Sequence, residues 1–180
     1  MHNLSLVIGI DPGRRGALAL LQRGMKAAVV DMPQVEGGAL NLRLIASLLA
    51  GWIQPGAVVA IEAAIAPGGP GGRSGHGFST YQREQGQLVG VAYGAVCTLP
   101  PGRAEGVVVE QIQPTSWKAH FGLWGGGKRG SADYLLDKGL ATVADLTPAR
   151  CRKPSDGRSD ALMIAMYAAI RGGWNVATRR

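Results

Sequence analysis

The sequence predicts an α/β fold with a five-stranded mixed sheet flanked by helices, and two patterns indicate it. Three short apolar runs, at 4–10, 17–21 and 26–32, are separated by tight glycine-containing turns, which is typical of an antiparallel meander. Two later apolar runs, at 57–62 and 106–112, each follow a helical pattern, as parallel strands do. The expected sheet therefore combines antiparallel and parallel strands.

The helices are predicted from apolar spacing and from their end signals. Leu40–Trp52 carries apolar residues close to helical spacing, and Pro55-Gly56 ends the run. A second helix is expected to contain Phe78, Tyr81 and the segment 85–96. The remaining expected helical segments are 114–118, 131–139 with Ser131 as its N-cap, 147–151, and the strongly apolar and buried 161–170.

Size, apolar runs and cysteines limit the class of protein. The 180 residues fit one domain over 1–180. The longest apolar runs, such as 161–170, are too short to span a membrane, and the N-terminus lacks a signal peptide pattern, so we expect a cytoplasmic protein. Cys97 and Cys151 lack metal-ligand spacing and are expected to be free thiols.

A net charge of +7 indicates a polyanionic partner, most often nucleic acid. Many basic residues fall in turns, glycine-rich loops and helix starts, where their side chains can reach phosphates. A basic surface that only maintains solubility is the alternative. The glycine-rich loops at 66–77 and 122–130 match neither a P-loop nor a dinucleotide fingerprint. The candidate DNA-contacting residues in these regions are Arg14, Arg15, Arg73, Lys128, Arg129 and Arg158.

Acidic residues end two of the predicted buried strands. Asp11 ends the first strand where Pro12-Gly13 turns the chain, and Glu62 ends the strand at 57–62. If these strands pair in parallel, the two carboxylates lie side by side and repel each other unless a divalent cation lies between them. The alternative for Asp11 is a local role, in which its side chain opens the turn through an Asx hydrogen bond.

Two further acids precede the last apolar helix. Asp156 and Asp160 are four residues apart, so on a helix both carboxylates lie on one face, about one turn apart. A cation relieves the repulsion between them. The alternative for Asp156 is a helix N-terminal cap that the helix dipole favours. His120 is an alternative auxiliary group, although a lone histidine on a helix is more often a surface residue.

Three motifs resemble those of RuvC-type Holliday junction resolvases, which are crossover junction endodeoxyribonucleases with a ribonuclease H-like fold. These motifs are Gly-Ile-Asp-Pro-Gly at 9–13, Ile-Glu at 61–62 and Ser-Asp-Ala-Leu-x-Ile-Ala at 159–165. Pro-x-x-Trp-Lys at 114–118 and the later Lys128 also resemble the lysines of that family. The resemblance spans nearly the whole chain, and the small size resembles compact or phage forms.

The resemblance implies a set of metal ligands. Asp11, Glu62 and Asp160 are expected to hold two Mg²⁺ ions per active site, with Mn²⁺ as a substitute and Asp156 completing the set. The chain departs from the family pattern at Gly157, where an acid or histidine usually stands three residues before the last aspartate. The expected catalytic residues are these four acids and Lys118, which is also expected to contact the DNA backbone together with Lys128.

The resemblance also implies a reaction and its partners. Two-metal hydrolysis of phosphodiesters is expected to make paired symmetric nicks in a four-way DNA junction, leaving 5′-phosphate and 3′-hydroxyl ends. Two symmetric cuts imply a homodimer, with the helix after Phe78 as the interface. Phe78 or Tyr81 is expected to stack on an unpaired base at the crossover.

Other interpretations remain open at this point. Substrate geometry is not encoded in these motifs, so a related nuclease that cuts other branched or flap DNA fits them equally. A junction-binding protein without catalysis is a second alternative. Gly86, Gly90 and Gly94 form a small-residue helix face that allows close contact with the sheet, which is the preferred expectation, or with a second copy of the chain.

Overall fold

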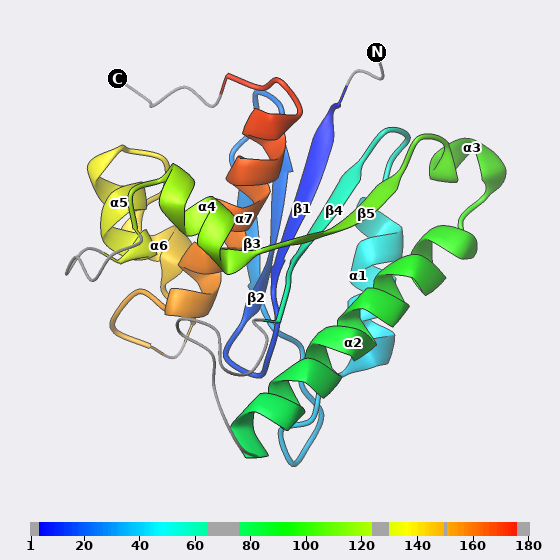
Figure 1. The fold of residues 1–180 in the computed structure, drawn as a ribbon, viewed down its shortest axis with the longest axis horizontal. Coiled ribbons are helices and arrows are strands. Elements are labelled where there is room, and N and C mark those ends of the chain that lie inside the picture. The colour runs from blue at the N-terminus through cyan, green and yellow to red at the C-terminus, as the bar shows by residue number, and fades with distance from the viewer. Residues whose placement is uncertain (1–3, 65–75, 124–129, 150, 176–180) are drawn as a thin grey trace.

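A five-stranded mixed sheet with helices on both faces forms the centre of the protein, which confirms the predicted α/β class (Figure 1). The computed structural model describes residues 4–64, 76–123, 130–149 and 151–175, with only the backbone described at 76–78. The sheet has the order β3-β2-β1-β4-β5. The strands are β1 Leu6–Asp11, β2 Ala17–Gln22, β3 Ala28–Asp31, β4 Val58–Glu62 and β5 Val108–Ile112.

The pairing of the strands matches the prediction. β1 pairs antiparallel with β2, and β2 pairs antiparallel with β3, so the first three strands form the expected meander. β4 pairs parallel with β1 on one side and with β5 on the other. The parallel pairs require long crossovers, and helices supply them. The carboxyl ends of β1 and β4 therefore reach the same edge of the sheet.

The helices agree with the prediction except near residue 147 and at 101–104. The expected helix at 147–151 is wrong, because the short helix lies one turn earlier, where Thr142 and Asp145 cap each other reciprocally. Pro101–Ala104 is a further short helix that the prediction lacked. The helices are α1 Leu42–Trp52, α2 His76–Cys97, α3 Pro101–Ala104, α4 Pro114–His120, α5 Ser131–Asp137, α6 Val143–Leu146 and α7 Asp156–Arg171.

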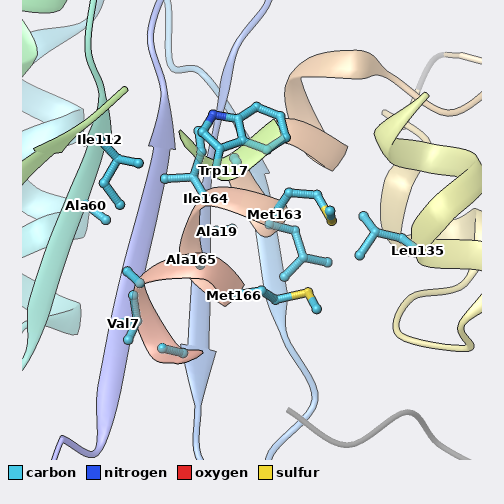
Figure 2. Packing of buried hydrophobic residues seen from close by; sticks show 14 of the residues in the cluster. Val7, Ala19, Ala60, Ile112, Trp117, Leu135, Met163, Ile164, Ala165 and Met166 are labelled. Atoms are coloured by element: carbon cyan, nitrogen blue, oxygen red, sulfur yellow. The ribbon is translucent and has the colours of Figure 1, made fainter. Parts of the chain in front are cut away.

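Side-chain alternation along the strands divides the core between the two faces of the sheet. Ile8 and Ile10 of β1 face α1 and α2, together with Ile61 of β4. Val7 of β1 and Ala60 of β4 face α7. Figure 2 shows side chains of this second cluster filling the space between β1, α7 and α5. Any residue that continues the Val7 or Ala60 face therefore points to the α7 side.

Backbone-to-backbone packing joins α7 to the first hairpin. A Cβ placed on Gly9 would overlap the carbonyl oxygen of Ala161 and lie 2.5 Å from the amide nitrogen of Ala165. A Cβ on Gly157 would overlap the carbonyl oxygen of Arg15, in the turn between β1 and β2. Because neither glycine carries a side chain, α7 lies directly on the backbone of β1 and of the turn that follows it.

The glycine face of α2 points away from the sheet. An added Cβ at Gly86, Gly90 or Gly94 would meet no atom within 4 Å, so the expected packing of this face on the sheet is wrong. Leu88 and Ala92 are fully buried instead, on the opposite side of the helix. Helical spacing explains the difference, because residues 88 and 92 share one face and the glycines fall on the other. Within the described ranges, no helix is long and apolar enough to cross a bilayer.

Gly9→Ala is expected to destabilise the protein by about 3 kcal/mol or more, because the new methyl overlaps the α7 backbone. Gly51→Ala in α1 is the matched control, since an added Cβ there meets no atom within 4 Å. The control should be neutral or stabilising by up to about 1 kcal/mol. Denaturant unfolding followed by circular dichroism measures both changes, and equal values for the two variants would contradict the close approach.

Candidate active site

The predicted strand-end acids lie in neighbouring strands at one edge of the sheet. Ile10 of β1 is opposite Ile61 of β4, so Asp11 and Glu62 follow in the next row. Adjacent strands are about 5 Å apart. Asp11 continues the side-chain face of Val7, and Glu62 continues that of Ala60, so both carboxylates point to the α7 side.

The first turns of α7 bring Asp156 and Asp160 to the same edge, at the bottom of the sheet in Figure 1. Burial raises the pKa of Asp11 well above its usual 3.8, and the charges of Glu62, Asp160 and Asp156 raise it further. Burial likewise raises the pKa of Asp160 to about 6, against the hydrogen bond from Ser131. The charges of Glu62 and Asp156 therefore act on both Asp11 and Asp160.

Asp156 is the most exposed of the four acids. Ser155 occupies the N-cap of α7 and accepts from the amide of Arg158, so Asp156 is not the capping residue. Its side chain is exposed to solvent at the start of the helix. Its charge still acts on both Asp11 and Asp160. Asp156 thus lies at the solvent side of the acid group.

Glu62 is held by two side-chain donors from different helices. Trp117 Nε1 of α4 donates to Glu62 Oε1 at 3.0 Å, and Tyr81 Oη of α2 donates to Glu62 Oε2 at 3.0 Å. Glu62 is only 8% exposed and Trp117 is fully buried. Because both carboxylate oxygens are hydrogen-bonded, the orientation of Glu62 is fixed by the protein.

Lys118 supplies a positive charge among the acids. Its charge lowers the pKa of both Asp11 and Asp160, which partly offsets the effects of burial and of the neighbouring carboxylates. The ammonium lies 4.9 Å from the centre of the Trp117 ring, and Trp117 anchors α4 in the core. The lysine predicted from the sequence motif is therefore brought to the predicted acids.

The donor set fits a hard divalent cation by its chemistry. Carboxylate oxygens are the preferred ligands of Mg²⁺, and a bound cation would oppose the rise in pKa that burial and then the neighbouring carboxylates cause at Asp11 and Asp160. Among the described residues, no three His, Cys, Asp or Glu side chains already surround a common point as a metal-holding group. Each hydrogen-bonded carboxylate oxygen keeps a second lone pair, so the bonds from Tyr81, Trp117 and Ser131 are compatible with ligation.

The predicted DNA-contacting residues differ in their surroundings. Arg15 is exposed in the turn beside the acids, and Arg14 is half exposed while its Nε donates to Glu84 Oε1 at 3.3 Å. The hydroxyl of Tyr81 donates a hydrogen bond to Glu62. Outside the described residues lie Arg73, Lys128, Arg129 and the Phe78 side chain.

Arg158 is used inside the fold. Its guanidinium binds both carboxylate oxygens of Asp31, at 2.6 and 2.9 Å, and donates to the backbone carbonyls of Asp145 and Thr147. The side chain is only 13% exposed. A planar guanidinium with these four contacts joins β3, α6 and α7, so we remove Arg158 from the candidate DNA-contacting set. His120 packs edge-on against Phe121 and Tyr167.

Two residues near the acids escaped the sequence reasoning. Glu84 is buried at 5% exposure, and it lies beside the Gly13 turn and pairs with Arg14. Ser131 was expected to cap α5, but Gly130 holds the N-cap position and the Ser131 hydroxyl donates to Asp160. The i, i+3 spacing of Tyr81 and Glu84 was the available signal, since it places both on one helix face.

Comparison with known proteins supports the fold assignment. No protein-family model matches the chain, and no curated protein matches it in sequence. Among solved structures, the chain is similar to the yeast mitochondrial Holliday junction resolvase Ydc2, with a TM-score of 0.53 and 14% identity. The match covers 89% of this chain and 76% of that one. At this identity the likeness concerns the fold, and it agrees with the predicted sheet flanked by helices.

Asp11→Asn is expected to stabilise the metal-free protein at neutral pH. Asp11 and Asp160 have folded-state pKa values above the usual 3.8, so stability falls as pH rises from about 4 through those values. The penalty is absent below about pH 4 and complete above the folded-state values. Removing one of these charges should raise the melting temperature by about 5 °C at about pH 8 in EDTA, with little change near pH 4.

Glu105→Gln is the control for this stability measurement. Glu105 is exposed and lies before β5, at the opposite edge of the sheet from the acids. Its substitution should leave the melting temperature unchanged at both pH values. A destabilised Asp11→Asn variant at about pH 8 would contradict the repulsion among these carboxylates.

Proposed function

We propose that this protein is a Mg²⁺-dependent endonuclease that resolves four-way DNA junctions. The observation that carries the proposal is the meeting of Asp11, Glu62 and Asp160 at one sheet edge beside Lys118, in a chain with a net charge of +7. Such an acid group inside a basic protein is costly unless it binds cations, and a basic surface attracts DNA. The similarity in fold to a Holliday junction resolvase supports the same assignment.

The metal ligands we propose are Asp11, Glu62 and Asp160, with Asp156 as the fourth acid. Bound Mg²⁺ would supply an activated water and would neutralise the charge that develops on the phosphate. Asp11 and Asp160 come from elements whose backbones pack directly on each other, an arrangement that would hold the two carboxylates in place. Preorganised ligands of this kind need no rearrangement when charge develops.

The remaining residues of the site orient the DNA. Lys118 is the proposed partner of the scissile phosphate, because its ammonium already lies among the carboxylates that face the substrate. Arg15 is exposed in the adjoining turn and would contact the neighbouring backbone phosphates. The positive charges of Lys118 and Arg15 would hold the phosphodiester next to the acid group. Without them, the negative phosphate would be repelled by the carboxylates.

A synthetic four-way junction and a linear duplex of the same sequence, each incubated with Mg²⁺ and with EDTA, test the proposal. Junction resolution predicts paired symmetric nicks with 5′-phosphate ends in the junction only, and only with Mg²⁺. Cleavage of flap or other branched DNA at equal rates would favour the related nuclease. Junction binding without cleavage under any metal condition would favour a non-catalytic binding protein.

The acid variants are expected to lose cleavage in a graded order. Asp11→Asn and Asp160→Asn should each lower the single-turnover cleavage rate at least about a thousandfold while junction binding in Ca²⁺ persists. Asp156→Asn should lower it only about tenfold, because Asp156 is exposed and its charge has the smallest effect on the pKa of Asp11 and Asp160. Glu105→Gln serves again as the control, and full activity of Asp11→Asn would refute the metal-ligand assignment.

Two symmetric cuts require two active sites, so we propose a homodimer that uses the exposed glycine face of α2. Gly86, Gly90 and Gly94 leave room for a second helix to approach closely, because an added Cβ there meets no atom of the same chain. Tyr93 is 52% exposed at the side of this face and adds apolar area.

Gly90→Arg is expected to produce monomers if this face forms the dimer. The new side chain fills the gap between two closely packed helices but meets only solvent within one chain. Sedimentation velocity at several protein concentrations measures the change, and circular dichroism confirms that the variant is folded. Gly51→Arg in α1 is the control, and a dimer that survives Gly90→Arg would place the interface elsewhere.

A further inference from the structure

We propose that Tyr81 is a positioning residue for Glu62, acting through its hydroxyl, and that it does not serve as a base-stacking residue. This inference rests on the proposed metal-dependent function. The Tyr81 hydroxyl donates to Glu62 Oε2, the oxygen that Trp117 leaves unoccupied. Glu62 is thereby held from two sides, by α2 on one and α4 on the other.

The part of α2 that carries Tyr81 and Glu84 lies beside the turn of the first hairpin. Gly13 has a φ of +103°, and its ideal Cβ position lies 3.9 Å from the Tyr81 ring and 3.8 Å from Glu84 Oε2. The positive φ favours glycine at this turn, and Tyr81 and Glu84 of α2 lie within van der Waals range of it, beside the end of β1. The Arg14–Glu84 ion pair then ties the same part of α2 to the turn.

Tyr81 and Glu84 consequently make contacts with both strand ends that carry the acids. Glu84 reaches the turn after Asp11, and Tyr81 reaches Glu62 at the end of β4. The two contacts come from neighbouring turns of one helix, so α2 sets the orientation of Glu62 relative to Asp11. A stacking role would need the Tyr81 ring to leave this position and would break the bond to Glu62.

Partners that orient a metal-binding side chain are worth about 10- to 100-fold in metal affinity. Removing the Tyr81 hydroxyl leaves Glu62 Oε2 without its donor and frees the carboxylate to rotate. The effect on metal affinity should therefore come from the hydroxyl alone. The ring would contribute packing and would matter for DNA only if it stacked on a base.

Tyr81→Phe separates the two roles, because phenylalanine keeps the ring and loses the hydroxyl. The measurement is Mn²⁺ affinity of the DNA-free protein, from calorimetry and from the Mn²⁺-induced rise in melting temperature. Tyr81→Phe should weaken Mn²⁺ binding about 10- to 100-fold and leave junction binding in EDTA unchanged. Trp117→Phe, which removes the other donor to Glu62, should weaken Mn²⁺ binding in the same direction.

Tyr93→Phe is the matched control on the same helix, since its hydroxyl donates to the Val109 carbonyl at 3.4 Å. It should bind Mn²⁺ as the wild-type protein does. Wild-type Mn²⁺ affinity in Tyr81→Phe would overturn the positioning role, as would a Tyr81→Ala variant that lost junction binding while Tyr81→Phe retained both properties. A wild-type protein that binds no Mn²⁺ would instead refute the proposed function itself.

Discussion

The direct packing of α7 on β1 is the constraint on which the site depends. At Gly9 the two backbones approach so closely that a single methyl group would not fit. A larger residue would move α7 outward and with it Asp160, while Asp11 would stay on its strand. The apolar core on this face, which includes Val7 and Ala165, stabilises the same contact through burial. The packing of the core on this face therefore also determines where the acids lie.

The same arrangement concentrates negative charge where the fold would be more stable without it. Asp11 and Asp160 are partly buried and repel each other, and Lys118 offsets only part of this effect. Proteins tolerate clustered charges of one sign when a bound ligand neutralises them. Such destabilising clusters are found most often at functional sites. The strands that end in Asp11 and Glu62 are strongly apolar and buried, and the stabilisation from this burial offsets the cost of the clustered carboxylates.

The sequence was sufficient for the sheet and for the position of Asp11 and Glu62 at the ends of neighbouring strands. Apolar runs separated by turns are local signals of strands. Once the parallel strands pair, the acid at the end of each strand lies next to the acid at the end of its neighbour. The contacts of Arg158 were not predictable in this way, because Asp31 is 127 residues away and no periodicity links the two. The same holds for Tyr81 and Glu62, which meet only because α2 folds back across the sheet.

Two errors came from local signals that compete with each other. Residues 147–151 carry helix-compatible residues, but the reciprocal cap of Thr142 and Asp145 starts the helix earlier. The glycines of α2 suggested close packing, yet the spacing of Leu88 and Ala92 already assigned the buried face to the other side. In both cases amino-acid composition was compatible with two structures. Side-chain hydrogen bonding determined where the short helix begins, and burial determined which face of α2 packs on the sheet.

The glycine at 157 explains why this chain departs from the family pattern that its motifs resemble. A Cβ at Gly157 would overlap the Arg15 carbonyl oxygen and lie 2.8 Å from the Cα of Gly16. An acid or histidine here would push the start of α7 off the hairpin and separate Asp160 from Asp11. In the proposed metal site, a fourth carboxylate would therefore have to come from a position that does not face the hairpin, and Asp156, one residue earlier, is exposed to solvent. The close approach of α7 thus accounts for the absence of a side chain at position 157.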